Sequence, residues 1–314
     1  MMERFENFML SVMVTLVVAF TLLCALLVLR RARHRAVQRV RLRAIGELAT
    51  MVGADLPPSY RAIDALAESY PIAVLAEALI SVAEAVCGMR LYRVAMIAER
   101  SGVYDYLQRA AACSSSLGRA RYLAMLAKFP LSRRYGDYVT VFADDEDEAV
   151  RFYTFVVQLV ADAEAAVPRL ASLERRLSPA ELSVLLALLR RGDYPIAYTP
   201  LLRSENHNLR MLGVMVASHF GDADCEPLLH SIVGREDTTS VEALYALASL
   251  RGNVAREEVQ RLVSGLPASR RRSLCRHFAY AGYSCGALGE LLDAGEQHYF
   301  EELLSSYKRP ILCS

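Results

Sequence analysis

Apolar side chains recur every three to four residues along almost the whole chain from Leu48 onward, with no convincing alternation of apolar and polar residues. This spacing places the apolar side chains on one face of a helix, so the pattern predicts an all-α protein of short helices. Residues that cap or break helices mark several boundaries: Ser59 as an N-cap after Pro57-Pro58, and breaks at Tyr70-Pro71 and Cys87-Gly88.

Short turns recur in the second half of the chain with a period near 30 residues. They lie at Asp162, Gly192-Asp193, Gly221-Asp222, Gly252-Asn253 and Gly282-Tyr283. Each turn follows a first helix, predicted over residues 149–161, 182–191, 208–220, 240–251 and 271–281. Each precedes a second helix, predicted over residues 163–173, 195–202, 223–233, 255–266 and 287–292.

Most of these turns contain the same types of residue, a glycine and an Asp or Asn. We expect the glycine to adopt a positive φ that ends the first helix, and the Asp or Asn to cap the second helix. A single pair of such helices cannot bury both of its apolar faces, whereas stacked neighbours can. The period therefore predicts an α-solenoid of stacked antiparallel helix pairs.

These units resemble HEAT repeats of the short bacterial, PBS-lyase-HEAT-like type. The matching positions are Val150-Arg151 and Ala166-Val167-Pro168 within residues 147–173, and Leu209-Arg210 and Pro227-Leu228-Leu229 within residues 206–233. A third unit, residues 238–263, has Glu242 where the arginine would be. The resemblance implies a solenoid whose second helices line a concave face. HEAT-like arrays mostly bind proteins, and a few are enzymes or DNA readers.

A run of 22 residues without a charge, Phe8–Leu29, precedes the helical repeats. As a helix it would reach about 33 Å, enough to cross a bilayer, so a transmembrane helix is predicted over residues 8–29. A cleaved signal peptide is the alternative, but arginines follow the run instead of a small-residue cleavage site. Positive flanks stay in the cytoplasm, which predicts a single-pass protein of the inner or plasma membrane. Residues 1–7 would lie outside and residues 30–314 in the cytoplasm.

Residues 30–54 are expected to continue this helix as a basic stalk. The arginines nearest the membrane should contact anionic lipid headgroups, at about 1 kcal/mol each: Arg30, Arg31, Arg33, Arg35 and Arg39. Nucleic-acid binding is the alternative role of this stretch. The charge of the rest of the chain argues against nucleic-acid binding. Residues 44–314 carry 28 basic and 33 acidic side chains, a net charge of about −5.

The domain organisation follows from these features. Diverged helical repeats are predicted over residues 55–144, HEAT-like repeats over 145–304, and a tail over 305–314. The tail is either a short docking peptide or a loose terminus.

Candidate chemistry is sparse. The seven cysteines are scattered without a C-x-x-C pair, which indicates free thiols in a reducing compartment. His219, Cys225 and His230 lie within 12 residues, but on poorly matching helix faces, so we expect no metal site and no cofactor. Nucleotide-binding, nucleophile-elbow and zinc-protease motifs are absent from the sequence, so we expect neither enzyme activity nor a small-molecule substrate.

Two charge runs have local interpretations. The acidic residues 144–148 precede a first helix, where they would cap it and suit its dipole; a site for a cation or a basic partner is the alternative. The arginines at 270–272 open a helix, the end where cations are unfavourable, which makes them contact candidates besides a solvated face.

The sequence therefore favours a membrane-anchored cytoplasmic scaffold or adaptor that holds a partner protein on the concave face of its solenoid. The expected contacts are polar positions of the second helices: Arg169, Arg203, Glu226, His230, Arg256 and Gln260. Envelope or exopolysaccharide assembly would need such a regulator, although no motif specifies the pathway. The alternatives are a HEAT-like enzyme of the lyase type and a nucleic-acid-binding solenoid. The first needs a pocket of convergent titratable groups, and the second needs a basic stripe.

Overall fold

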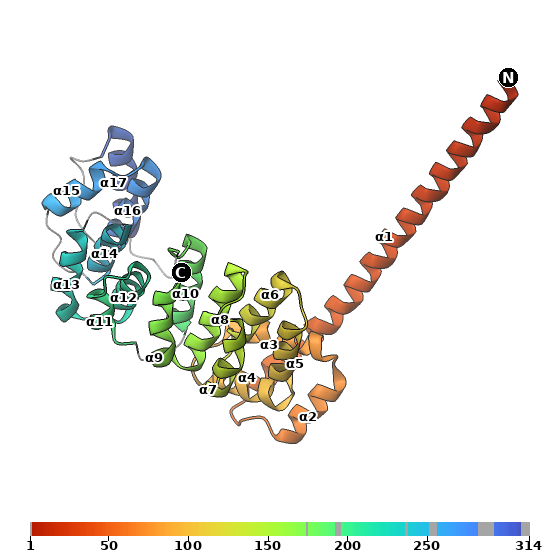
Figure 1. Cartoon of the computed structure of the whole chain (residues 1–314), viewed down its shortest axis with the longest axis horizontal. Coiled ribbons are helices and arrows are strands. Elements are labelled where there is room, and N and C mark those ends of the chain that lie inside the picture. The colour runs from red at the N-terminus through yellow and green to blue at the C-terminus, as the bar shows by residue number, and fades with distance from the viewer. Residues whose placement is uncertain are drawn as a thin grey trace. The chain divides into compact units, whose positions relative to one another are not determined.

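The computed structural model of the chain describes residues 2–173, 175–191, 196–235, 238–250, 256–281 and 292–308 (Figure 1). Within helices, the side chains of residues 2–19 and 256–259 also lie outside the description, as do a few single ones. The described residues form helices and turns, and none of them lies in a strand. The prediction of an all-α fold is therefore confirmed over this part of the chain.

The chain divides into two compact units. Unit 1 comprises Met1–Leu131 and Val141–Val157, and unit 2 comprises Ser132–Thr140 and Gln158–Ser314. The helices of unit 1 are α1 (Met2–Gly53), α2 (Tyr60–Ser69), α3 (Ile72–Ala85), α4 (Met89–Arg100), α5 (Val103–Ala112) and α6 (Ser116–Leu126). Helix α3 packs against α1, α4 and α5, and α5 packs against α6, so neighbours in sequence are neighbours in space.

The C-terminal part of α1 joins unit 1, while Figure 1 shows its N-terminal part running away from the other helices of that unit. Ala44 and Leu48 are completely buried and Val52 nearly so, at the spacing of one helix face. Arg41 adds polar contacts to α3: it donates a hydrogen bond of 2.9 Å to Ser81 Oγ and lies 3.5 Å from the Glu77 carboxylate. Arg41 therefore links α1 to α3.

Among the residues whose side chains are described, the structure contains no helix that is both long and apolar enough to cross a membrane. The predicted membrane segment, residues 8–29, begins among residues whose side chains lie outside the description.

Several predicted helix ends are confirmed. Ser59 Oγ accepts a hydrogen bond of 3.3 Å from the Ala62 amide at the start of α2. Asp162 Oδ1 accepts one of 3.1 Å from the Ala165 amide, capping α9 (Ala163–Ala166). Gly102, a glycine outside the predicted turns, follows α4 and has a φ of 75° in the left-handed region, where a side chain would be strained.

The expectation of a positive φ at Gly221 is wrong. Its φ is −70°, in extended backbone that any residue adopts. Glycine is needed there for space, because a Cβ atom would clash with the Ala217 carbonyl oxygen and lie 2.9 Å from Cys225 Sγ. The glycines of the turns at 192, 252 and 282 lie outside the described residues.

Helix α8 (Glu148–Ala161) is the first of the predicted first helices, and the others are α10 (Pro179–Arg191), α12 (His207–Phe220), α14 (Thr238–Ser249) and α16 (Ala268–Ala281). Helix α10 begins three residues before its predicted start. Ser178 Oγ accepts a 3.3 Å hydrogen bond from the Glu181 amide, and Glu181 Oε2 accepts one of 2.8 Å from the Ser178 amide. This capping box starts the helix at Pro179.

The second helices are α9 with the 3-10 helix η2 (Val167–Ser172), α11 (Tyr198–Leu202), η3 (Ala223–Cys225) with α13 (Glu226–Val233), and α15 (Arg256–Ser264). The range 223–233 is helical as predicted, and the range 163–172 ends one residue early. Helix α11 begins three residues later than predicted, and α15 ends two residues earlier. The predicted second helix at 287–292 lies almost entirely outside the described residues, and α17 (Ala294–Lys308) follows it. Unit 2 also contains α7 (Arg133–Tyr138), and η1 (Val139–Phe142) follows it.

The first helices of unit 2 pack in a row. Helix α12 packs against α10 on one side and α14 on the other, and α14 packs against α16. The second helices α11 and α13 also contact each other, and each packs against its neighbouring first helix. A shared core from α11 to α17 includes Leu202, Leu229, Leu247, Phe278 and Phe300. This sequential pairing is consistent with a repeat solenoid.

An arginine with one recurring role stands at the fourth residue of four helices: Arg119 in α6, Arg151 in α8, Arg210 in α12 and Arg271 in α16. Each guanidinium donates to backbone carbonyls five or six residues earlier, in the loop before its helix. The arginine therefore satisfies loop carbonyls that would otherwise be short of partners. This contact is a physical reason for an arginine early in the first helices.

Candidate functional site

The residues predicted for partner binding lie on or beside the second helices. Arg203 and Gln260 are exposed, and His230 Nε2 lies 3.7 Å from Glu226 on the same helix. Arg169 is exposed beside a small cavity of about 80 Å³, where Arg133 and Asp162 form an ion pair of 3.1 Å. The side chain of Arg256 lies outside the description. The structure does not gather these residues into one pocket.

The arginines predicted to contact the membrane lie on α1. Arg30, Arg31, Arg35 and Arg39 are exposed, and the side chain of Arg33 lies outside the description. They precede Ala44, where α1 first becomes buried, so they remain available to a charged surface.

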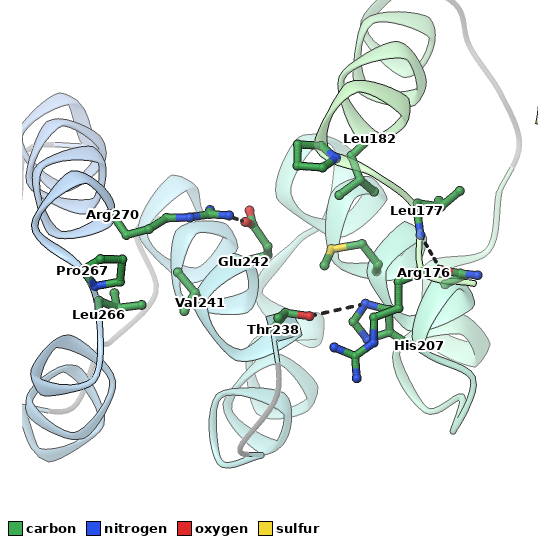
Figure 2. Close-up of a pocket in the computed structure, with 13 residues that line it drawn as sticks. Arg176, Leu177, Leu182, His207, Thr238, Val241, Glu242, Leu266, Pro267 and Arg270 are labelled. Atoms are coloured by element: carbon green, nitrogen blue, oxygen red, sulfur yellow. Dashed lines mark hydrogen bonds and ion pairs between the residues drawn. The ribbon is translucent and has the colours of Figure 1, made fainter. Parts of the chain in front are cut away.

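Two larger cavities of unit 2 lie on its first helices. We call the one at the start of these helices the N-terminal hollow. It has a volume of about 350 Å³ and is lined mainly by the first turns of α10, α12 and α14 and by Leu266, Pro267 and Arg270 (Figure 2). Leu182, Met211 and Val241 make its lining largely apolar. We call the second, of about 700 Å³, the C-terminal hollow; it lies further along α10, α12, α14 and α16.

Glu242 lines both hollows and is the point where they meet. Its carboxylate lies 3.5 Å from Arg270 Nη1, and Figure 2 shows the two side chains pointing toward each other. Burial raises the pKa of Glu242, and the nearby Arg270 opposes this without cancelling it. The carboxylate is therefore in an environment that disfavours its charge.

His277 and Ser249 line the C-terminal hollow but do not form a nucleophile and base. His277 Nε2 lies 2.8 Å from Ser249 Oγ and 2.9 Å from the carbonyl oxygen of Tyr245. A carbonyl oxygen only accepts, so Nε2 carries the proton and cannot take one from Ser249. The Ser249 hydroxyl itself donates to the same carbonyl at 3.0 Å. Burial lowers the pKa of His277, which favours this neutral imidazole.

Tyr245 lines the C-terminal hollow. Burial raises the pKa of its phenol, and Ser273 acts in the opposite direction. Its hydroxyl oxygen is buried and makes no hydrogen bond of normal geometry within the described residues. Because this oxygen is not exposed, it is not offered to a molecule in the hollow.

In the described part of the chain, no three His, Cys, Asp or Glu side chains gather closely enough to hold a metal ion. Cys225 is buried, and its thiol donates to the Asp222 carbonyl oxygen at 2.9 Å. Burial raises the pKa of Cys225, so the residue remains a thiol at neutral pH.

The two charge runs have structural partners. Asp147 Oδ1 accepts a 2.8 Å hydrogen bond from the Ala149 amide at the start of α8, and Asp145 forms an ion pair with Arg119. Arg271 donates to Glu296 and to the Leu266 carbonyl oxygen. Arg270, paired with Glu242, is the member of its run that faces a cavity.

The sequence pattern did not single out the first helices as a binding surface. A signal was present in α12, where His207, Met211, Met215 and His219 follow each other at intervals of four residues, along one helix face. All four line the hollows. The pattern is ambiguous in the sequence, because methionines at helical spacing also fill cores.

Comparison with known proteins finds no matching family and no curated protein of similar sequence. The fold and surface define the chain as an all-α protein of sequentially packed helix pairs.

Proposed function

We propose that this protein is a membrane-anchored scaffold or adaptor. One helix over residues 8–29 holds it in the inner or plasma membrane, and its cytoplasmic HEAT-like helix pairs bind a partner protein. The observation that carries the proposal is the row of first helices in unit 2, which leaves an extended hollow surface lined by methionine, tyrosine, histidine and arginine. Methionine, tyrosine and arginine are enriched at protein interfaces.

The anchor is supported by the run without charges and by the side chains of α1. Phe20, Leu22, Leu26 and Val28 are each more than half exposed, although they lie on several sides of the helix. A helix that is apolar all round is unfavourable in water and favourable in lipid. The arginines that follow it supply the charge asymmetry that directs the repeats into the cytoplasm.

The alternative function, an enzyme, would use the titratable groups of the C-terminal hollow. None of those that the structure describes is arranged as an activated nucleophile. His277 is held as a proton donor to a backbone carbonyl, and Glu242 is engaged with Arg270. Such groups orient the helices and offer hydrogen bonds to a protein surface. A scaffold therefore accounts better for this geometry than a lyase.

In-cell crosslinking of the full chain, followed by mass spectrometry, tests the proposal. We expect a protein partner to be recovered with the membrane fraction, and the variant lacking residues 8–29 to leave that fraction while remaining helical. A defined substrate turned over by the purified chain, or no reproducible partner, would contradict the scaffold. A full chain extracted by alkaline carbonate would contradict the anchor.

The second-helix prediction is tested by the variant Arg169→Glu/Arg203→Glu. Both side chains are exposed, so the variant should keep its thermal unfolding midpoint. Loss of the partner would place the interface on the second helices. Unchanged recovery would place it elsewhere on the repeats.

A further inference from the structure

We propose that the two hollows on the first helices form one groove that binds an acidic segment with apolar side chains from a partner protein. This inference rests on the proposed scaffold function and names the surface and the chemistry of its partner. Neither the repeat pattern nor the second-helix residues point to this groove.

The position of the hollows makes a groove of useful length. They meet at Glu242 and together touch α10, α12, α14 and α16. Packed helices lie about 8–10 Å apart, so crossing four of them covers about 25–30 Å. An extended segment rises about 3.3 Å per residue and would need about eight or nine residues to follow this path.

The charge of the groove favours an acidic occupant. Among the described residues that line the two hollows, Glu242 is the one acid, and it already faces Arg270. Arg176 lines the N-terminal hollow and Arg190 the C-terminal hollow, and both are exposed. No ion pair is formed by either side chain with the described residues. Arg176 stands just before α10 and Arg190 in its last turn, so both cationic groups lie on the α10 side of the groove, where they would attract carboxylates and repel a basic segment.

The lining between these arginines favours apolar side chains. Leu182 and Val241 are half-buried in the N-terminal hollow, and Leu186 and Met215 are half-buried in the C-terminal hollow. Such surfaces gain from being covered, and methionine adapts to varied shapes.

The test measures binding of synthetic peptides to the full chain in nonionic detergent by fluorescence anisotropy. The probe is a fluorescein-labelled peptide of twelve alternating glutamates and leucines. We expect it to bind, and a lysine-leucine peptide of equal length not to bind. In the variant Arg176→Ser/Arg190→Ser, affinity for the acidic peptide should fall about tenfold, as two lost charge contacts predict. Raising the salt concentration should weaken binding to the unchanged protein.

The matched control is Arg61→Ser/Arg90→Ser, which removes two exposed arginines of unit 1. It should bind the acidic peptide as the unchanged protein does, and both variants should keep the same thermal unfolding midpoint. Equal binding of the two peptides, or equal affinity in Arg176→Ser/Arg190→Ser, would overturn the groove. A second copy of the chain as the occupant would appear as a dimer in light scattering and would also overturn it.

The outcome separates this inference from the scaffold function. If the peptide result is negative while the crosslinked partner is still recovered, the groove is wrong and the scaffold stands. If no partner is recovered, the scaffold itself is wrong whatever the peptide does.

Discussion

Glu242 on α14 lies 3.5 Å from Arg270 on α16, and this contact joins two first helices at the point where the two hollows meet. The pair is imperfect, because burial raises the pKa of Glu242 despite the nearby guanidinium. At this buried position the charged carboxylate stabilises the folded chain less than the protonated carboxyl group does.

The variant Glu242→Gln tests whether burial outweighs the attraction of Arg270 for the Glu242 carboxylate. A pKa raised above the ordinary value of 4.5 means that the folded state holds its proton more tightly than the unfolded state. The contribution of Glu242 to stability is therefore lost as pH rises above 4.5 through the folded pKa. We expect the variant to gain stability relative to the unchanged chain between pH 4.5 and pH 7.5, measured by thermal unfolding. Identical pH profiles would show that Arg270 compensates for burial after all.

The variant His277→Gln should change stability in the opposite pH range. Burial lowers the pKa of His277 below 6.5, so the folded state favours the neutral imidazole. This contribution is complete above pH 6.5 and is lost as pH falls toward the folded pKa. We expect the variant to lose about 1 kcal/mol at pH 7.5 through its hydrogen bonds. When the pH is lowered to 5.5, the free energy of unfolding of the variant should fall by less than that of the unchanged chain, as measured by urea unfolding. A parallel decline of both proteins would be evidence against the neutral histidine.

Gly213 allows α12 to approach α11 closely. A Cβ atom at this position would lie 2.8 Å from both Leu201 Cβ and the Leu202 amide nitrogen. Alanine is the better helix former by about 1 kcal/mol, so helix propensity alone predicts stabilisation by Gly213→Ala. We expect the clash to dominate and to destabilise unit 2 by about 1–3 kcal/mol in urea unfolding. Gly46→Ala, in α1 with open space around the site, serves as the control and should not destabilise.

Glu296 holds α17 to α16. It is almost fully buried, and Arg271 Nε lies 3.1 and 2.9 Å from its two carboxylate oxygens. Removing one partner of a buried pair leaves the other charge uncompensated, so Glu296→Gln should cost about 2–4 kcal/mol in urea unfolding. Glu301→Gln, at an exposed position of the same helix, should cost under about 0.5 kcal/mol. A small loss in both variants would mean that solvent screens the Arg271 pair.

Local patterns placed many helix ends correctly where the controlling contacts are also local. Ser59 and Asp162 cap helices through amides three residues further along, so both were predictable from neighbouring residues. The predicted reason for Gly221, a positive φ, is wrong, because the atoms that exclude a side chain there are the Ala217 carbonyl oxygen and Cys225 Sγ. The capping box of Ser178 and Glu181 is equally local, because its two residues lie three apart in the sequence.

The sequence by itself determined that this chain is helical, where most helices of unit 2 lie, and that they recur about every 30 residues. Apolar spacing and capping residues encode these features within one or two turns of chain. Only the tertiary structure decided which exposed side chains share a surface. Glu242, Arg270 and Arg176 come together because successive helix pairs stack in one register, and the packing of their cores sets that register. Contacts across 28 residues or more follow from that stacking and leave no local pattern to detect.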